Sequence, residues 1–329
     1  MSNLSKYVYA LGRGPSKGRN LTRAESNDAM CEILSGTAAP EAVGALLMLM
    51  RYRGETPDEI AGFVDAMRTR IKPWQEIKAD LDWPSYAAGR TRGNPWFLLS
   101  AKLVALAGFS VVLHGWNSHQ NPVASVVNAV DTLNIPVSKN PQQTKTALAT
   151  HGITYCPLGD IDQSALDLLK LRGVLGLRSA INTALRALNP CMAPATVQGV
   201  FHPSYRGLQQ ASAALLDQKN MTVIKGGGGE FECNPCKDTQ IFMCQDGQEH
   251  QATLPASIDE HHRLSAASRD INETAALWHG EIQNEFAQQI VISTTTLALK
   301  TCDPNLSLDQ ASHWAGTLWL ERHQNRATA

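Results

Sequence analysis

The stretch that decides the fold is GALLMLMRYRGETPDEIAGFVDAM, which runs from Gly44 to Met67. Its first half belongs to a compact apolar run from Glu41 to Tyr52, whose pattern favours a helix that ends at Gly54. Its second half begins with Thr56-Pro-Asp-Glu59, a capping box in which the Thr hydroxyl and the Glu carboxylate satisfy free backbone N–H groups. The stretch therefore predicts two consecutive helices joined by a short turn.

Working outward, a second capping box, Thr22-Arg-Ala-Glu25, marks the start of another helix. These signals predict a small N-terminal helical domain over residues 1–73. From Trp83 onward, apolar runs such as Ser110–His114 and Met221–Lys225 alternate with helical segments. This alternation is typical of an α/β domain with a mainly parallel sheet, to which we assign residues 74–329.

The remaining segments of the larger domain have clear local patterns. A helix is expected from Trp96 to Ala107. The polar and acidic stretch Gln251–Asp270 is expected to form a connecting excursion. Amphipathic helices are expected within Glu273–Ala298 and within Ser307–His323.

Composition limits the class of protein. The chain has 329 residues, of which 43% are hydrophobic, and this is enough for two domains of unequal size. The longest apolar stretch, Leu98–Leu113, contains Lys102 and Gly108, so we expect neither a membrane span nor a signal peptide. Seven cysteines without a repeating framework favour reduced thiols and a cytoplasmic protein without membrane contact.

Positive charge is unevenly distributed, although the net charge is only −1. Residues 1–23, 83–130 and 168–216 contain no Asp or Glu, yet each contains several Lys or Arg residues. If these three stretches meet in space, the protein has a strongly positive face that suits a polyanionic partner.

Two blocks of sequence resemble glycosyl transferase family 3, which includes anthranilate phosphoribosyltransferase and the pyrimidine nucleoside phosphorylases. The first is the Gly44–Met67 stretch, which resembles the family's helical-domain signature. The second is LRGVLGLRSAINTALRALNP, Leu171–Pro190, which resembles the block after the family's second active-site loop. The resemblance implies a helical domain, a larger α/β domain, a cleft between them and a homodimer.

The resemblance breaks where the family binds phosphoribosyl pyrophosphate. The family's Gly-Thr-Gly-Gly-Asp loop and Asn-x-Ser-Thr segment are replaced by PSYAAGRTRGNPWFLL, which runs from Pro84 to Leu99 and contains Arg90 and Arg92. The family's Lys-His-Gly-Asn-Arg appears as Leu113-His-Gly-Trp-Asn117, which keeps His114 and Gly115 but loses the lysine. Arg172 falls on the arginine that contacts the aromatic acid in the family's transferases.

A further departure concerns the family's metal motif, His-Gly-x-Asp-Gly-x-Asp-Glu, which supplies carboxylates for Mg²⁺. The corresponding segment here is Lys225-Gly-Gly-Gly-Gly-Glu-Phe-Glu232. Phe231 replaces the aspartate, so Glu232 remains, with Glu230 as a possible stand-in. We therefore expect no cofactor, and Mg²⁺ only if transferase activity persists. His114, Gly115, Arg172 and Glu232 are vestigial catalytic candidates, and no nucleophile can be named beside His114.

Within the family, the pattern resembles the YbiB branch, whose members bind nucleic acid. The similarity lies in Ser85-Tyr86 followed by basic residues, in Gly12-Arg-Gly-Pro-Ser-Lys-Gly-Arg19, and in Asn234-Pro235. The predicted function is sequence-tolerant binding of single- or double-stranded nucleic acid in a basic groove, completed across a homodimer. The predicted phosphate contacts are Arg13, Lys17, Arg19, Arg90, Arg92, Lys102, Arg172, Arg178 and Lys225.

Two alternatives remain open at the level of sequence. One is an active phosphoribosyltransferase or glycosyltransferase with an altered substrate, and the other is a regulatory protein that binds a small nucleotide. Each basic residue also has an ordinary explanation as a solvated or ion-paired side chain. Cys233-Asn-Pro-Cys236, with Cys244 beyond, suggests zinc, but no second pair follows at the spacing of a zinc finger.

Overall fold

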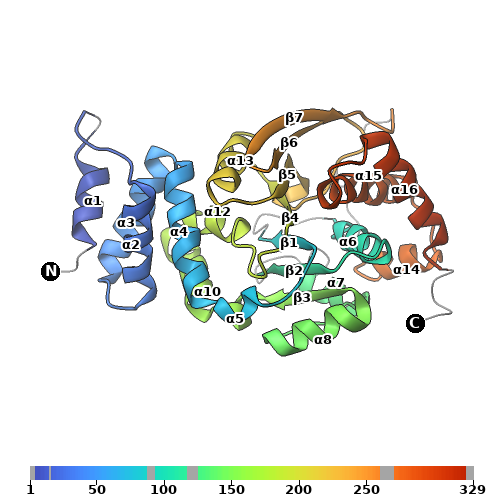
Figure 1. Cartoon of the computed structure of the whole chain (residues 1–329), viewed down its shortest axis with the longest axis horizontal. Helices are drawn as coiled ribbons and strands as arrows, with labels where there is room; N and C mark the ends of the chain where they lie inside the picture. Colours follow the sequence, from blue (N-terminus) through green and yellow to red (C-terminus); the bar gives the residue numbers. More distant parts are fainter. Residues whose placement is uncertain (1–3, 15, 87–92, 117–124, 260–269, 324–329) are drawn as a thin grey trace.

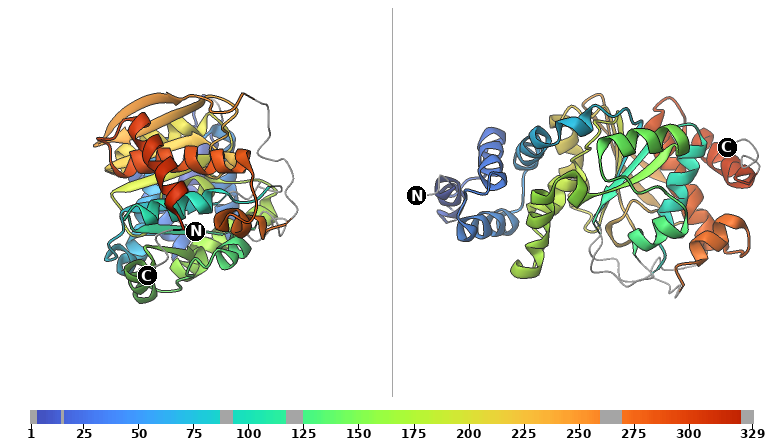
Figure 2. Two further views of the ribbon diagram at one scale, coloured as in Figure 1. Left: turned by 90° about the vertical axis from the view of Figure 1, so that its right-hand side faces the viewer. Right: turned by 90° about the horizontal axis from the view of Figure 1, so that it is seen from below.

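The computed structural model consists of a group of N-terminal helices beside a larger α/β part (Figure 1). The N-terminal helices lie at one end of the long axis and the C-terminal helices at the other (Figure 2). The structure describes residues 4–14, 16–86, 93–116, 125–259 and 270–323.

The N-terminal part is helical, as the sequence predicts. Its helices are α1 (Ser5–Gly12), α2 (Arg23–Leu34), α3 (Pro40–Arg53), α4 (Pro57–Arg70) and α5 (Lys72–Gln75). Both predicted capping boxes are confirmed, since Thr22 and Thr56 each accept a hydrogen bond from the backbone N–H of the Glu three residues later. Gly54 ends α3 with φ of 84°, a conformation that favours glycine.

The α/β part is built on one sheet of seven strands with the order β3-β2-β1-β4-β5-β6-β7. The strands are β1 (Leu81–Ser85), β2 (Val111–Gly115), β3 (Ile153–Pro157), β4 (Ala195–Val200), β5 (Asn220–Lys225), β6 (Thr239–Gln245) and β7 (Gln248–Leu254). The first five strands are parallel, while β6 and β7 are antiparallel to their neighbours. The prediction of a mainly parallel sheet is confirmed.

Helices cover both faces of the sheet (Figure 1). Those that follow β1 in the chain are α6 (Phe97–Leu106), α7 (Val126–Thr132), α8 (Pro141–His151), α9 (Leu158–Ile161), α10 (Gln163–Lys170), α11 (Arg172–Leu175), α12 (Ala180–Arg186), α13 (Tyr205–Leu215), the short 3₁₀ helix η2 (Gly227–Gly229), α14 (Glu273–His279), α15 (Glu285–Cys302) and α16 (Leu308–Glu321). Helices α6, α15 and α16 lie on one side of the sheet, and α12 and α13 lie on the side that faces the N-terminal helices.

Two predictions about the C-terminal third need correction. The first four residues of the predicted excursion, Gln251–Leu254, belong to strand β7, which pairs with β6 through a tight turn at Asp246-Gly247. Both turn residues have positive φ, and Asp-Gly is a typical hairpin pair, so the signal was present in the sequence. The helical region after Glu273 is divided because Gly280, with φ of 75°, ends α14.

The hydrophobic core of the helical part is completed by residues from far along the chain. One buried cluster joins apolar residues of α1 to α4 with others from α9, α10 and α12. Polar contacts reinforce this packing: Arg68 of α4 donates to the backbone oxygens of Leu188 (2.8 Å) and Ala187 (3.2 Å). A second cluster lies between the sheet and α6, α15 and α16. Within the described residues, no helix is long and apolar enough to cross a membrane.

Candidate functional site

A cavity of about 300 Å³ lies between the helical part and the carboxyl end of the sheet. One wall begins at the end of β4, with Val200, Phe201 and His202. Strand β4 adjoins β1 at the point where the strand order changes direction. In open α/β sheets, this is the position at which ligands are usually bound.

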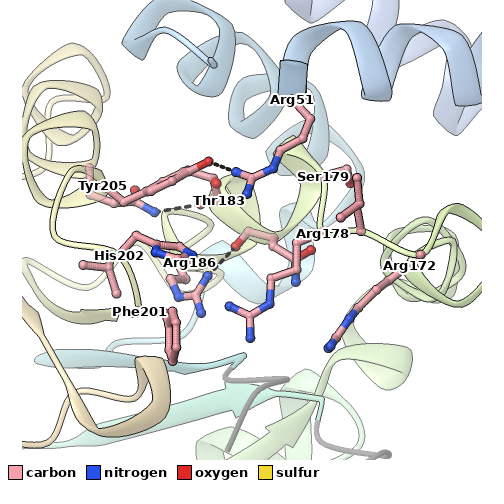
Figure 3. Close-up of a pocket in the computed structure, with 14 residues that line it drawn as sticks. Arg51, Arg172, Arg178, Ser179, Thr183, Arg186, Phe201, His202 and Tyr205 are labelled. Atoms are coloured by element: carbon pink, nitrogen blue, oxygen red, sulfur yellow. Dashed lines mark hydrogen bonds between the residues drawn. The ribbon is translucent and has the colours of Figure 1, made fainter. Parts of the chain in front are cut away.

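Four arginines line the cavity: Arg51, Arg172, Arg178 and Arg186. Arg51 comes from the last turn of α3, Arg172 begins α11, Arg178 precedes α12, and Arg186 is the last residue of α12. Gly176 has φ of 71° and ends α11, which turns the chain so that Arg178 enters the same space (Figure 3). No Asp or Glu lines this cavity in the part of the chain that the structure describes.

Arg186 is the most deeply buried of these arginines, with 6% of its surface exposed. Its guanidinium donates to the backbone oxygens of Asn182 (3.1 Å) and Tyr86 (3.3 Å). Burial lowers the pKa of Arg186, and the nearby carboxylate of Glu230 opposes this effect. Neutral carbonyls thus fix the orientation of a buried cation at the edge of the cavity.

Arg178 is surrounded mainly by other cations. Its guanidinium lies over the ring of Phe201, with 5.8 Å between the guanidinium carbon and the ring centre. Burial lowers the pKa of Arg178 to about 10, and repulsion from Arg186, Arg172 and Arg51 acts in the same direction. An anion in the cavity would relieve this repulsion.

Arg51 connects the helical part to the opposite wall. It donates a hydrogen bond to the hydroxyl of Tyr205, which in turn donates to a carboxylate oxygen of Glu55 over 2.9 Å. Burial, followed by the charge of Glu55, raises the pKa of Tyr205 to about 12. Tyr205 therefore stays protonated near neutral pH and bridges the two parts of the molecule.

The three residues after the four glycines Gly226–Gly229 have different partners. Glu230 accepts a hydrogen bond from Ser85 Oγ over 2.9 Å. Phe231 is fully buried and meets Trp83 edge-on, with ring centres 5.5 Å apart. Glu232 is also buried and accepts a hydrogen bond from the backbone N–H of Phe97 (3.0 Å), at the start of α6. The three side chains thus have different partners: a serine hydroxyl, an aromatic ring and a backbone N–H.

The glycines of this segment allow close packing of backbone on backbone. A Cβ atom on Gly226 would lie 1.6 Å from the carbonyl oxygen of Glu230, and one on Gly199 would lie 2.0 Å from the carbonyl carbon of Glu230. The N–H groups of Gly226, Gly227 and Gly229 donate to backbone oxygens. These amides hold the segment together and are not directed at a ligand.

His114 lies inside a buried polar network at the end of β2. Its Nε2 is 3.1 Å from Oδ1 of Asp82, and its Nδ1 is 2.8 Å from the hydroxyl of Tyr86. The contact with the Tyr86 hydroxyl has hydrogen-bond geometry, whereas the close approach of Nε2 to Asp82 Oδ1 does not. Thr196 donates to Asp82 (2.8 Å). The next residue, Gly115, has to be a glycine, because a Cβ atom there would lie 2.0 Å from the backbone oxygen of Ser85.

The acidic and thiol candidates do not form a metal centre. The described residues contain no group of three His, Cys, Asp or Glu side chains placed to hold a metal ion. Cys233 is buried, and its N–H donates to Thr294. Burial raises the pKa of the Cys233 thiol to about 12, so a thiolate ligand is disfavoured at this position.

The predicted phosphate contacts are only partly brought together. Arg172 and Arg178 line the cavity, and Lys225 is exposed at the end of β5, which precedes the tetraglycine segment. Lys102 lies on α6, on the other side of the sheet, where it donates to Leu133 O (2.9 Å) and lies over Trp278. The expected convergence of all three acid-free stretches is therefore incorrect for Lys102. Arg90 and Arg92 lie outside the described residues.

The basic residues of the first loop lie at the outer end of α3. Arg53, in the last turn of α3, donates to the backbone oxygens of Leu11 (3.4 Å) and Gly18 (3.3 Å) and thereby fixes this loop. Arg13 and Lys17 are exposed on it. Arg19 differs, because it forms a two-bond ion pair with Glu25, each bond 2.6 Å long.

Several cavity residues were not singled out from the sequence. Arg51 and Arg186 lie within the two blocks that carry the family resemblance, but nothing in their spacing shows that they meet. Phe201, His202 and Tyr205 follow a buried strand, which is the available signal, because residues at the carboxyl ends of parallel strands often line ligand sites.

Comparison with known proteins agrees with this architecture. Residues 7–71 match the glycosyl transferase family helical bundle domain. Anthranilate phosphoribosyltransferase from Thermus thermophilus superposes with a TM-score of 0.77 at 20% identity, covering 100% of both chains. The enzyme from Saccharomyces cerevisiae, in complex with PRPP and Mg, gives a TM-score of 0.77 at 17% identity, covering 98% of this chain and 95% of that one. The fold is thus that of the anthranilate phosphoribosyltransferases.

Similarity in sequence extends over most of the chain. Anthranilate phosphoribosyltransferase from Geobacillus sp. (strain WCH70) is 25% identical over 295 residues, covering 86% of this chain and 85% of the relative. The enzyme from Geobacillus stearothermophilus is 28% identical over 248 residues, covering 74% of this chain and 72% of the relative. The chain thus has a glycosyl transferase family helical bundle domain and resembles anthranilate phosphoribosyltransferases over most of its length.

Proposed function

We propose that this protein binds nucleic acid through its phosphate groups, in a sequence-tolerant manner, and that its phosphoribosyl-pyrophosphate and Mg²⁺ sites are degraded. The observation that carries the proposal is the cavity lined by four arginines and by no described carboxylate. A cluster of guanidinium groups in a partly closed space is suited to phosphate oxygens, which accept paired N–H bonds.

The basic loop after α1 extends this positive surface beyond the cavity. Arg51 and Arg53 lie in the same last turn of α3, and they contact the cavity wall and the loop, respectively. The diameter of a helix, about 10 Å, separates these two sides. A single strand that leaves the cavity therefore has to pass around this helix to reach Arg13 and Lys17.

The residues present do not fit the Mg²⁺ site that the family implies. Phe231 replaces a carboxylate and packs in the core against Trp83. Glu232 is directed at the N-terminus of α6, and Glu230 at Ser85. Mg²⁺ binding requires several oxygen ligands within about 2.1 Å of one point, and the described residues contain no group of three His, Cys, Asp or Glu side chains placed in this way.

The test is a titration of labelled single-stranded DNA of unrelated sequences at several salt concentrations. The logarithm of the affinity should fall linearly with the logarithm of the salt concentration, because phosphate contacts release counterions. Replacing Arg13 and Lys17 together by Gln should flatten this line by about one to two units for all sequences alike. A matched control is Lys139→Gln, because Lys139 is exposed at the start of α8, away from the cavity.

Binding that is absent at low salt would overturn the proposal. So would binding that depends on one base sequence, since phosphate contacts carry no sequence information. A loop variant with an unchanged slope would exclude the loop while leaving the cavity to be tested by Arg178→Gln. Thermal unfolding of each variant identifies any loss of binding that results from misfolding.

A second candidate function is a phosphoribosyltransferase or related glycosyltransferase with an altered substrate. The observation that favours it is the size of the cavity, about 300 Å³, which falls within the range of small-molecule sites. Its test is turnover of phosphoribosyl pyrophosphate with anthranilate at high Mg²⁺. Turnover that is lost on Glu232→Gln would favour this candidate over the first.

A homodimer in the cytoplasm completes the proposal. The outer helices α1 and α3 expose Tyr9 and Tyr52, with 64% and 90% of their surfaces accessible. Exposed aromatic side chains of this kind are common in subunit interfaces. Light scattering of the purified protein and of a Tyr9→Ser/Tyr52→Ser variant tests this part, and a monomeric wild-type protein would contradict it.

A further inference from the structure

Among the described residues that line the cavity, four are arginines and none is a carboxylate. The guanidinium groups of Arg172, Arg178 and Arg186 all project into it (Figure 3). The carboxylate that acts on both Arg178 and Arg186 is that of Glu230, which does not line the cavity and accepts a hydrogen bond from Ser85. The clustering of several guanidinium groups around one cavity favours a ligand with two negative charges over a ligand with one.

The opposite wall offers an aromatic surface of limited extent. Phe201 is 47% exposed, and its ring meets that of His202 edge-on, with ring centres 4.9 Å apart. A base can stack on such a ring only if it is unpaired, because paired bases are stacked inside a duplex. The cavity volume, about 300 Å³, is at the lower end for ligand sites and suits a single nucleotide.

We infer that the cavity binds a phosphate monoester, such as the terminal phosphate of a single-stranded nucleic acid, with the adjoining base against Phe201. This inference rests on the function proposed above and specifies the group that enters the cavity. A phosphate monoester carries about 1.5 to 2 negative charges near neutral pH, whereas an internal phosphate diester carries one. An oligonucleotide end and a free mononucleotide share this chemistry.

The experiment compares single-stranded oligonucleotides of one sequence with a 5′-phosphate, with a 3′-phosphate and with neither. An unphosphorylated oligonucleotide that is one nucleotide longer controls for the added charge. A phosphate at one end should tighten binding about tenfold, as charge-assisted hydrogen bonds do. The additional internal phosphate should change the affinity by less than about twofold, since salt screens distant charges. Competition by a nucleoside monophosphate tests the free mononucleotide.

The advantage of the phosphorylated end should depend on pH. The second pKa of a phosphate monoester is about 6, so its second negative charge is lost below that pH while the arginines stay charged. The ratio of the two affinities should therefore fall between about pH 7.5 and pH 5, and it should stay above one because the monoester keeps one negative charge. The unphosphorylated oligonucleotide lacks this titrating group, and its affinity should change less.

Two variants separate the cavity from the outer loop. Arg178→Gln should abolish the preference for the phosphorylated end, and it should fold because the described contacts of Arg178 are with the Phe201 ring and not with backbone. Lys17→Gln should weaken binding of both oligonucleotides equally and leave their ratio unchanged. A ratio that survives Arg178→Gln in a folded protein would overturn the inference.

The remaining outcomes are also decisive. Salt-dependent binding with equal affinity for all ends would overturn this inference and leave the proposed function intact. Saturable binding of the mononucleotide without binding of any oligonucleotide would support the monoester site and contradict nucleic-acid binding. Absence of both would contradict both proposals.

Discussion

The arginine cavity and the core around Phe231 lie on either side of one segment, but the first is open and the second is tightly packed. On one side of the Gly226–Glu232 segment, a Cβ on Gly229 would lie 3.6 Å from Arg186, which faces an open cavity. On the other side, Phe231 packs against Trp83, which is stacked with Phe97 at 6.1 Å between ring centres. One side leaves room for an anion, and the other is filled by aromatic rings.

The comparison indicates which of the two regions is maintained for binding and which for folding. Aromatic burial stabilises the fold without reference to a ligand, since each buried ring contributes through the area removed from water. Clustered arginines destabilise the fold. Burial and mutual repulsion disfavour their charged form, and both effects lower the pKa of Arg178. A feature that costs folding free energy is expected to be maintained by binding.

The largest expected effect comes from Phe231→Asp, which puts back the carboxylate that the family resemblance implies. We expect the free energy of unfolding to fall by about 5 kcal/mol, because ring packing is lost and a charge is buried beside Trp83. Urea denaturation measures the loss. The control Phe231→Leu keeps an apolar side chain and should cost less than about 2 kcal/mol. An Asp variant of normal stability that binds Mg²⁺ would show that the region is an adaptable metal site.

The next effect is smaller and concerns the cap on α6. Glu232→Ala should destabilise the protein by about 1 to 2 kcal/mol, because the carboxylate accepts the hydrogen bond of the Phe97 N–H. Glu232→Gln retains an acceptor oxygen and should lose less. Denaturation with and without Mg²⁺ distinguishes the roles. Stabilisation by Mg²⁺ of the wild-type protein but not of the Gln variant would contradict the capping role.

Removal of a charge from the cavity should raise the stability of the protein, in contrast to the two changes above. Arg178→Met should raise stability, by at most about 1 kcal/mol since solvent screens the repulsion. The sign follows from the lowered pKa: below about pH 10 the arginine is charged in both states, and the folded state disfavours that charge. Thermal melts at low and high salt test this, and the gain should shrink as salt increases.

The control for this variant is Arg53→Met. Arg53 donates to the backbone oxygens of Leu11 and Gly18 and to Asn20, so its loss should lower stability. A destabilised Arg178→Met protein would mean that Arg178, like Arg53, has a structural role.

The smallest effect concerns an arginine that has a partner. Hydrogen bonds from Arg19 lower the pKa of Glu25 to about 2, from an ordinary value of 4.5. The stability from this pair is present above about pH 4.5 and is lost as the pH falls toward 2. Arg19→Gln should therefore flatten the decline of the melting temperature in this range. Arg13→Gln should not, because Arg13 lies over the Tyr9 ring.

Local sequence signals were sufficient for most elements. Both capping boxes, the end of α3 at Gly54 and strands β2 and β5 lie where the sequence predicts them, because caps and apolar periodicity act over a few residues. Strand β7 was missed because its residues are mostly polar and exposed, and the Asp246-Gly247 pair was the remaining signal for the hairpin. For the candidate site, the sequence indicated Arg172 and Arg178 but also Lys102, which lies elsewhere.

What the sequence by itself determined is the order of helices and strands, the family likeness and the residues that depart from it, such as Phe231. Only the tertiary structure decided that Arg51, Arg178 and Arg186 share one cavity, since they come from separate elements that the core of α3, α4 and α12 brings together. The physical reason is that a sequence gives the position of a charged residue along the chain but not the groups that surround it in space. Whether an arginine meets a carboxylate, an aromatic ring or another arginine depends on packing between distant segments.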